Sequence, residues 1–210
     1  MTTLKKVNTK EIFEKAIRAT KLTPERTALL ETIAQHIANE IKNTNKVNIN
    51  FICTHNSRRS QFSQTWAYYA MEYFGIHNGF SFSSGTAVTA FHGNTVRALE
   101  ACGFDFKIKE FNHQNPQYVI SSGATSKTIT GFSKLVEDVE NQTPFIAITT
   151  CGNADENCPF IPTASQRIHL PYIDPKATDG TNEQDATYLA TSKLIAGELG
   201  FLFKTVKGLL

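Results

Sequence analysis

The sequence has little net charge of either sign, and this limits the partners that its composition can support. Lysine and arginine number 21 and the acids 19 in 210 residues, which gives a formal net charge of +2. A protein that binds nucleic acid or an anionic membrane through its overall charge carries a larger basic excess. We therefore expect no nucleic acid and no membrane as partners, although a single loop can still bind a small anion.

The chain also lacks the segments that export a protein or hold it in a membrane. Its start, MTTLKKVNTK, is polar and has no apolar stretch of the kind found in secretion signals. Glu11 and Glu14 follow in a helix-like segment, whereas transit peptides are poor in acids. No apolar run approaches the length that spans a bilayer. The sequence predicts a cytoplasmic protein.

Cysteine is scarce, with four residues: Cys53, Cys102, Cys151 and Cys158. A chain of this length can bury a core without disulfides, so the even number does not indicate a secreted disulfide framework. Thiols stay reduced in the cytoplasm, where paired cysteines tend to be catalytic. Cys102 shares an apolar helix face with Val96 and Leu99, and we expect it in the core.

The first 45 residues are predicted to form a helical extension. Thr23-Pro24-Glu25 is typical of a helix start. The apolar residues that follow it recur every four positions and mark one face: Leu29, Ile33, Ile37 and Ile41. We expect this face to cover the core of the main domain. Packing on a second subunit is the alternative, which leaves a homodimer open.

Beyond this extension, strands alternate with helices. The predicted strands lie at residues 47–53, 80–84, 145–148 and 167–170, and a hairpin around Gly123 joins the runs 117–121 and 127–130. Helices are predicted at 62–73, in a segment that ends near Gly103, and around 134–139. A last helix is predicted to open with a capping box from Thr181 to Gln184. This order indicates an α/β fold with a parallel sheet covered on both faces.

The loop from Cys53 to Arg59 connects a predicted strand to a predicted helix, where parallel sheets bind ligands. Its backbone N–H groups and the helix N-terminus favour an anion and would hold Cys53 as a thiolate. Arg59 can grip two oxygens of a tetrahedral oxyanion, and Ser60 can donate to the sulfur. A buried cysteine beside surface arginines is the weaker alternative, because the Cys-x5-Arg-Ser spacing is specific.

This loop resembles the Cys-x5-Arg-Ser/Thr signature of the low-molecular-weight protein tyrosine phosphatase superfamily. The matching residues are Cys53, Thr54, His55, Asn56, Ser57, Arg58, Arg59 and Ser60. The resemblance implies a flavodoxin-like, four-stranded parallel sheet flanked by helices, and oxyanion binding by residues 54–60. We predict a catalytic domain over residues 46–210, with the extension 1–45 and a hairpin insertion at about 115–131 outside the resemblance.

The resemblance also implies a general acid for the leaving group. In this superfamily an Asp-Pro pair on a late loop supplies it, and Asp174-Pro175 matches that pair in position. Proline restricts the preceding residue to extended conformations, which helps to aim its carboxyl group. Elsewhere an Asp-Pro pair would be interpreted as a turn.

Two branches of the superfamily differ after the first covalent step. In the phosphatases water hydrolyses a cysteinyl-phosphate, whereas thioredoxin-coupled arsenate reductases use two further cysteines. Cys151 and Cys158, followed by Pro159, match the cysteine pair of the reductases. The resemblance implies that Cys53 attacks arsenate and Cys151 then attacks Cys53. Cys158 next attacks Cys151, and a thioredoxin-like reductant restores the thiols.

Three functions therefore remain open. The first is an arsenate reductase, and the second is a phosphatase that hydrolyses phosphate esters with Cys53, Arg59 and Asp174. The third is a non-catalytic module that senses an oxyanion. We predict no cofactor and no metal, since a zinc site at Cys151 and Cys158 has wide spacing and no second ligand pair.

Three residues depart from the superfamily pattern. His55 stands where glycine is usual, in a loop that needs a positive φ, which histidine tolerates better than most residues. Arg58 stands at a position where cysteine is frequent, and it either strengthens the positive electrostatic field of the loop or is an exposed charge. Gln64 replaces a glutamate that is linked to potassium binding in the reductases. The hairpin insertion is a fourth departure, and it could cover the site.

Overall fold

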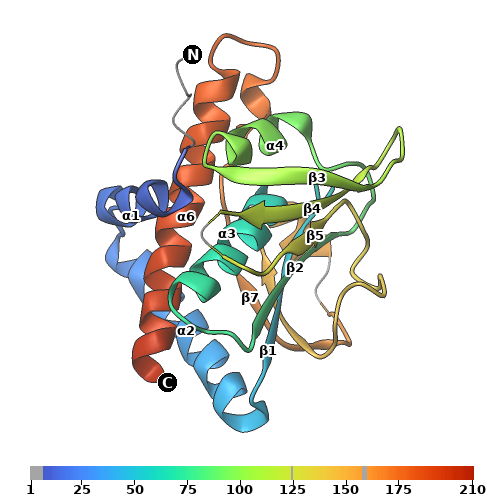
Figure 1. The fold of residues 1–210 in the computed structure, drawn as a ribbon. Coiled ribbons are helices and arrows are strands. Elements are labelled where there is room, and N and C mark those ends of the chain that lie inside the picture. The colour runs from blue at the N-terminus through green and yellow to red at the C-terminus, as the bar shows by residue number, and fades with distance from the viewer. Residues whose placement is uncertain (1–6, 124, 158–159) are drawn as a thin grey trace.

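A four-stranded parallel sheet forms the centre of the computed structural model, which describes residues 7–123, 125–157 and 160–210 (Figure 1). Its strands are β1 (Val47–Cys53), β2 (Gly79–Gly85), β6 (Phe145–Thr149) and β7 (Ala164–His169). They lie in the order β2-β1-β6-β7, and all three pairs are parallel. This is the flavodoxin-like order, and it confirms the predicted fold class.

Side chains alternate across the sheet and build a core on each face. Ile49 and Phe51 point into the main core, with helices α2 (Pro24–Thr44), α3 (Arg59–Tyr73) and α6 (Gln184–Leu209). Ile52 belongs to a smaller cluster on the other face, with residues of the loop before β6 and of the short helix α5 (Gly152–Asn157). Figure 1 shows the long helices gathered on one side of the sheet. Both faces are therefore covered, as predicted.

The N-terminal helices belong to the main core. Helix α1 (Thr9–Ala19) packs along α6, and its Phe13 is fully buried with its ring stacked 5.8 Å from that of Trp66. Helix α2 begins after Thr23, whose side chain accepts a hydrogen bond from the Arg26 N–H at 3.2 Å. Its inward face is fully buried at Leu30, Ile33 and Ile37. The expectation that this extension covers the core is confirmed.

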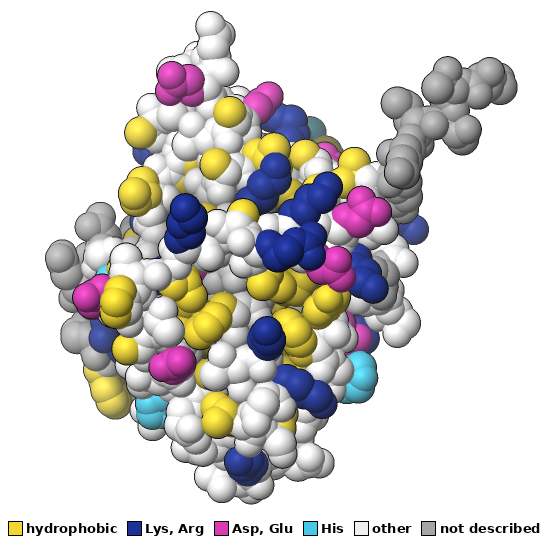
Figure 2. Space-filling model, turned by 90° about the vertical axis from the view of Figure 1, so that its left-hand side faces the viewer, with side chains coloured by type: hydrophobic (Ala, Val, Ile, Leu, Met, Phe, Trp, Pro, Cys, Tyr) yellow, Lys and Arg dark blue, Asp and Glu magenta, His cyan; other side chains and the backbone are white. Residues whose placement is uncertain are grey.

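Helices α1 and α6 leave a hollow of about 550 Å³ on the outer side of the extension. Apolar Ile12 and Leu194 line it together with lysines 15, 21 and 193. Figure 2 shows this side of the molecule, where basic side chains stand among apolar ones. The homodimer that the sequence left open stays a prediction.

A second, antiparallel sheet follows helix α4 (Gly93–Glu100). It consists of β3 (Phe104–Glu110), β4 (Gln117–Ser122) and β5 (Ile129–Gly131), in the order β3-β4-β5. The predicted hairpin is confirmed as β4 and β5. Strand β3 was not predicted, although Phe104, Phe106 and Ile108 alternate with polar residues. Cys102 is fully buried in the main core, as expected.

Two local predictions were wrong because tertiary partners decide the backbone there. The segment 134–139 is not helical: Leu135 forms a parallel bridge with Gly85, whose N–H donates to the Lys134 carbonyl at 2.9 Å. The capping box is absent, since α6 begins at Gln184 itself. The Gln184 side chain instead accepts from the Gly180 N–H at 2.9 Å. Among the described helices, none is long and apolar enough to cross a membrane.

Candidate active site

The loop predicted to bind an oxyanion, residues 53–59 (the P-loop), lies at the carboxyl end of the central strand β1. It leads directly into α3, which begins at Arg59, so the amino end of that helix faces the loop. Gly85 ends the neighbouring strand and pairs with Cys53. A Cβ at Gly85 would lie 2.7 Å from the Thr54 carbonyl oxygen and 2.9 Å from the Asn56 nitrogen. The loop therefore passes close over β2 because residue 85 has no side chain.

The positive φ of the P-loop falls at Asn56, at 44°, and not at His55 as we expected. Asparagine tolerates this region well, and His55 is exposed without needing it. The buried Asn56 side chain donates to Ser60 Oγ at 2.9 Å and accepts from the Lys134 N–H at 2.9 Å. This side chain thus ties the turn of the loop to the first turn of α3 and to the segment after β5.

Neighbouring segments hold the rest of the loop. The Ser133 hydroxyl donates to the His55 carbonyl at 2.9 Å, and the Gln61 side chain donates to the Phe132 carbonyl at 2.9 Å. Ser57 donates through its hydroxyl to the Ala90 carbonyl at 2.7 Å. Residues 132–134, directly after the hairpin, therefore hold the turn of the P-loop in place through hydrogen bonds. No local sequence pattern predicts this contact, because the residues are distant along the chain.

Cys53 and Ser60 form the predicted sulfur-hydroxyl pair. The Cys53 Sγ lies 3.0 Å from the Ser60 Oγ, and only 4% of the cysteine is exposed. A hydroxyl at this distance can donate to a thiolate, both before attack and when the sulfur later leaves. The geometry suits a nucleophile that is shielded from bulk solvent.

Arg59 and Asp174 lie together at the mouth of the P-loop. Arg59 Nη2 donates to Asp174 Oδ2 at 2.6 Å, and Nη1 donates to the Tyr172 carbonyl at 3.1 Å. The Nε of Arg59 is buried and has no hydrogen-bond partner within the described parts of the chain. A buried donor without a partner is costly, so this atom is a ready site for an oxygen of a bound oxyanion.

Asp174 lies in the loop between β7 and α6, directly before the 3-10 turn η1 (Pro175–Thr178). Its backbone is extended, with φ −76° and ψ 122°, as the following proline requires. Its Oδ1 accepts from the Lys176 N–H at 3.1 Å and so caps this turn. A third of the side chain is exposed, which leaves the carboxyl group accessible from the mouth of the site.

The second thiol of the predicted relay lies beside the P-loop. Cys151 follows β6, its sulfur is 3.5 Å from the Thr54 Oγ1, and it is 3% exposed. Cys53 and Cys151 belong to the same small apolar cluster. The short helix α5 follows Cys151, and the predicted role of Cys158 falls on a residue outside the described part of the chain.

Asp155 ties α5 to the ends of strands β6 and β7. Its Oδ1 accepts from the Thr149 hydroxyl at 2.8 Å and from Arg167 Nη2 at 2.6 Å. His169 Nδ1 lies 3.5 Å from the same oxygen. No local sequence pattern marks this cluster, because its members come from α5 and from two different strands.

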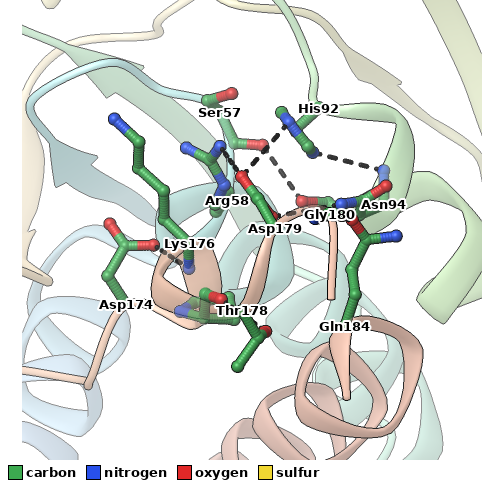
Figure 3. Close-up of polar contacts among 12 residues, drawn as sticks. Ser57, Arg58, His92, Asn94, Asp174, Lys176, Thr178, Asp179, Gly180 and Gln184 are labelled. Carbon is green, nitrogen blue, oxygen red and sulfur yellow. Dashed lines mark hydrogen bonds and ion pairs between the residues drawn. The ribbon is translucent and has the colours of Figure 1, made fainter. Parts of the chain in front are cut away.

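Arg58 is neither an exposed charge nor a free source of positive field. Its Nε donates to the Tyr188 hydroxyl at 2.6 Å and its Nη2 donates to Asp179 Oδ2 at 2.9 Å, as Figure 3 shows for the second contact. Burial by itself raises the pKa of Asp179. The hydrogen bond from Tyr188 and the charge of Arg58 outweigh burial and hold this pKa below its ordinary value. Burial, and then the hydrogen bond to Asp179, raise the pKa of Tyr188 to about 12. Asp179 and Tyr188 were missed; an arginine inside the loop was the only signal that such partners exist.

Gln64 makes contacts that suit an amide. Its Nε2 donates to the carbonyls of Thr130 at 3.0 Å and Ser81 at 3.3 Å, while its Oε1 accepts from the Ser83 hydroxyl at 2.6 Å. The carbonyl oxygens of Thr130 and Ser81 are thus bonded to a side-chain donor. Within the described residues, no group of three or more histidine, cysteine or acidic side chains could hold a metal ion.

Comparisons with known proteins agree with this geometry. An arsenate reductase of Halalkalibacterium halodurans is 29% identical over 161 residues, which cover 77% of this chain and 95% of the relative. An arsenate reductase of Brevibacillus brevis is 33% identical over 132 residues, which cover 62% of this chain and 78% of the relative. The solved low-molecular-weight protein tyrosine phosphatase of T. tengcongensis shares the fold, with a TM-score of 0.51 and 13% identity over 76% of this chain and 99% of that one.

No family model matches the sequence. The identity to the Brevibacillus brevis enzyme, over more than three quarters of that enzyme's length, is sufficient to assign the family. The parallel sheet, the P-loop and the Cys53, Arg59 and Asp174 side chains at its end are consistent with that assignment. This chain belongs to the arsenate reductase family, and it shares the fold of the low-molecular-weight protein tyrosine phosphatase of T. tengcongensis.

Proposed function

We propose that the protein reduces arsenate with Cys53 as nucleophile and passes the resulting disulfide through Cys151 and Cys158 to a thioredoxin-like reductant. The observation that carries this proposal is the position of Cys151, buried beside Thr54 and in one cluster with Cys53. Hydrolysis of a cysteinyl-phosphate by water does not require a second thiol there. The relatives of Halalkalibacterium halodurans and Brevibacillus brevis are both named arsenate reductase, which supports the same substrate.

In the first step the Cys53 sulfur attacks arsenic and a sulfur–arsenic bond forms. An arsenic–oxygen bond breaks, and the oxygen leaves as water after Asp174 gives it a proton. The P-loop N–H groups and Arg59 bind the remaining oxygens, with the unpaired Nε as one donor. Proton donation of this kind contributes on the order of 100- to 10,000-fold in rate.

In the second step the Cys151 thiolate attacks the Cys53 sulfur. The sulfur–arsenic bond breaks with its electron pair on arsenic, so arsenite leaves and a Cys53–Cys151 disulfide forms. Cys158 then attacks Cys151, Cys53 departs as a thiolate, and a Cys151–Cys158 disulfide remains. A dithiol reductant supplies the two electrons that reduce this bond. These reduced thiols persist in the cytoplasm, which we propose as the location.

The test is a coupled assay with thioredoxin, thioredoxin reductase and NADPH. Addition of arsenate should cause NADPH oxidation by the wild type and by Cys102→Ser, whose thiol lies in the core. Cys151→Ser should stop turnover after one adduct. Absence of NADPH oxidation above background in the wild type would remove the reductase proposal.

A second candidate, hydrolysis of phosphate esters, is favoured by the pairing of Arg59 with Asp174, which needs no further thiol. Under that function Cys151→Ser would keep full turnover of p-nitrophenyl phosphate. Disulfide mapping separates the two functions directly: a Cys151–Cys158 bond that appears with arsenate and not with phosphate selects reduction.

The boundaries of the catalytic unit are also a proposal. We assign the chemistry to residues 46–210, because each proposed site residue lies there, and treat 1–45 as an extension that completes the core. The hairpin insertion at about 115–131 ends next to residues 132–134, which support the P-loop.

A further inference from the structure

The segment 174–179, which lies between β7 and α6, is attached to the P-loop at both of its ends. At its start, Asp174 pairs with Arg59 at 2.6 Å. At its end, Asp179 pairs with Arg58 at 2.9 Å. Two consecutive P-loop arginines therefore hold the two ends of one short segment, with the turn η1 between them.

The Asp179 attachment is the more elaborate of the two. Its Oδ1 accepts from the Tyr188 hydroxyl at 2.6 Å and from the Asn94 side chain at 3.2 Å, while Oδ2 accepts from Arg58. Figure 3 shows Asp179 between Arg58, His92 and Asn94. The donors come from the P-loop, from α4 and from α6, so the carboxylate joins three parts of the fold.

His92 completes the surroundings of Asp179 without pairing with it at hydrogen-bond distance. Its Nδ1 accepts from the Asn94 N–H at 3.3 Å, so the neutral ring carries its proton on Nε2, which faces Asp179 at 3.9 Å. The ring stacks on Tyr188 at 5.8 Å. Burial and the charge of Arg58 lower the pKa of His92, which keeps the ring neutral.

The two attachments have different fates in the proposed reaction. Arg59 must bind the oxyanion, and an incoming anion competes with Asp174 for the same guanidinium. Asp174 must leave Arg59 to reach the departing oxygen. Arg58 is committed by Nε to Tyr188 and by Nη2 to Asp179, so its pair does not need to open.

We propose that Asp179 is a positioning residue that keeps the Asp174 loop docked on the P-loop while Asp174 exchanges Arg59 for the leaving oxygen. This inference rests on the proposed function, because it assumes that Asp174 is the proton donor. Asp179 touches no reacting atom. It acts by limiting how far the segment 174–179 can move when the first ion pair opens, which is how remote contacts preserve a productive geometry.

The first test compares two isosteric changes in the complete protein. Asp179→Asn should lower kcat for arsenate about tenfold, with a smaller change in KM, because proton donation by Asp174 is impaired while binding is retained. Asp185→Asn removes the same charge from an exposed position nearby and should leave kcat unchanged. Arg58→Met should reproduce the loss from the other side of the pair, and the double variant should be no slower than either single one.

The decisive test is the dependence on Asp174. In an Asp174→Asn background the Asp179→Asn change should have no further effect on kcat, since the proton donor through which it acts is gone. A further tenfold loss in that background would overturn the proposal, as would a wild-type kcat for Asp179→Asn alone. Tyr188→Phe keeps the ring packing and removes one donor, and it should give an intermediate loss.

A structural readout separates this proposal from the reductase proposal. Amide hydrogen exchange over residues 174–180 should be faster in Asp179→Asn than in the wild type or in Asp185→Asn. If the wild type reduces no arsenate but hydrolyses p-nitrophenyl phosphate, the same variants are compared on that ester. If neither substrate reacts, the reductase proposal fails. Unchanged amide exchange over residues 174–180 in Asp179→Asn would separately refute the proposal that Asp179 holds this segment on the P-loop.

Discussion

Lys134 is a buried lysine whose backbone N–H contacts the P-loop at Asn56. Only 2% of the residue is exposed, and its Nζ lies 4.7 Å from the centre of the Phe132 ring. Burial lowers the pKa of Lys134 from the ordinary 10.5 to about 8, and the charges of Asp138 and Glu140 oppose this shift. Burial of the charged form therefore lowers the free energy of unfolding.

The pH dependence of stability follows from this shift. Between pH 8 and 10.5 the unfolded chain holds the Lys134 proton and the folded chain does not, so the free energy of unfolding rises with pH in this window. The cost below pH 8 is about 3 kcal/mol. Lys134→Met removes it. The variant should be more stable than the wild type at pH 7, and its advantage should shrink by about 3 kcal/mol as the pH rises to 10.5.

Urea unfolding of both proteins across this pH range measures the difference. Lys204→Met, at an exposed position of α6, is the control and should show a constant difference from the wild type. A constant difference for Lys134→Met as well would mean that the ammonium is not buried as described.

At the scale of elements, the contact between α1 and α6 depends on a glycine. A Cβ at Gly197 would lie 1.8 Å from Thr20 Oγ1 and 2.7 Å from the Ala16 carbonyl, so the two helices touch backbone to backbone there. Gly208 lies in the same helix with nothing within 4 Å of the position of its Cβ.

Alanine at these two positions should therefore have opposite effects. Gly197→Ala should destabilise the protein by about 1–3 kcal/mol, because α1 must move away from α6. Gly208→Ala should stabilise it by up to about 1 kcal/mol through helix propensity, less near a fraying end. Chemical denaturation of both variants decides the matter. Equal effects of the two changes would contradict the close approach.

At the scale of the molecule, the extension and the predicted catalytic domain share one core. Phe13 contacts the rings of Trp66 and Tyr69, and the single tryptophan of the chain lies on α3, which follows the P-loop. Helix α2 adds Leu30, Ile33 and Ile37 to the same cluster. Unfolding of the extension alone would expose this surface, so the two parts are expected to unfold together.

Phe13→Ala should thus destabilise the whole molecule by about 3–5 kcal/mol, the usual cost of emptying a buried phenylalanine site. Tryptophan fluorescence and far-ultraviolet circular dichroism should report one common transition in the wild type and in the variant. Two separated transitions, with the catalytic part unaffected by Phe13→Ala, would show that the extension is an independent unit.

The sequence alone determined the features that local chemistry controls. Alternating and continuous apolar runs predicted the four parallel strands, and Thr23-Pro24 predicted the start of α2. Both signals are local, because the spacing of buried residues and the capping of a helix end depend on only a few neighbouring residues. The Cys53 to Ser60 spacing predicted an oxyanion loop at a strand end. Asp174 and Cys151 were named from the family resemblance, by their positions along the chain.

Only the tertiary structure decided which distant groups meet. It moved the positive φ from His55 to Asn56, whose side chain needs both Ser60 and the Lys134 N–H. It replaced the predicted helix at 134–139 by a bridge to Gly85, since pairing with β2 overrides weak helix propensity. It also gave Arg58 its partners from α6 and the Asp174 loop. Apart from the Asn56–Ser60 hydrogen bond, these contacts join residues 50 or more positions apart, and no local pattern encodes which of them will be adjacent once the sheet has formed.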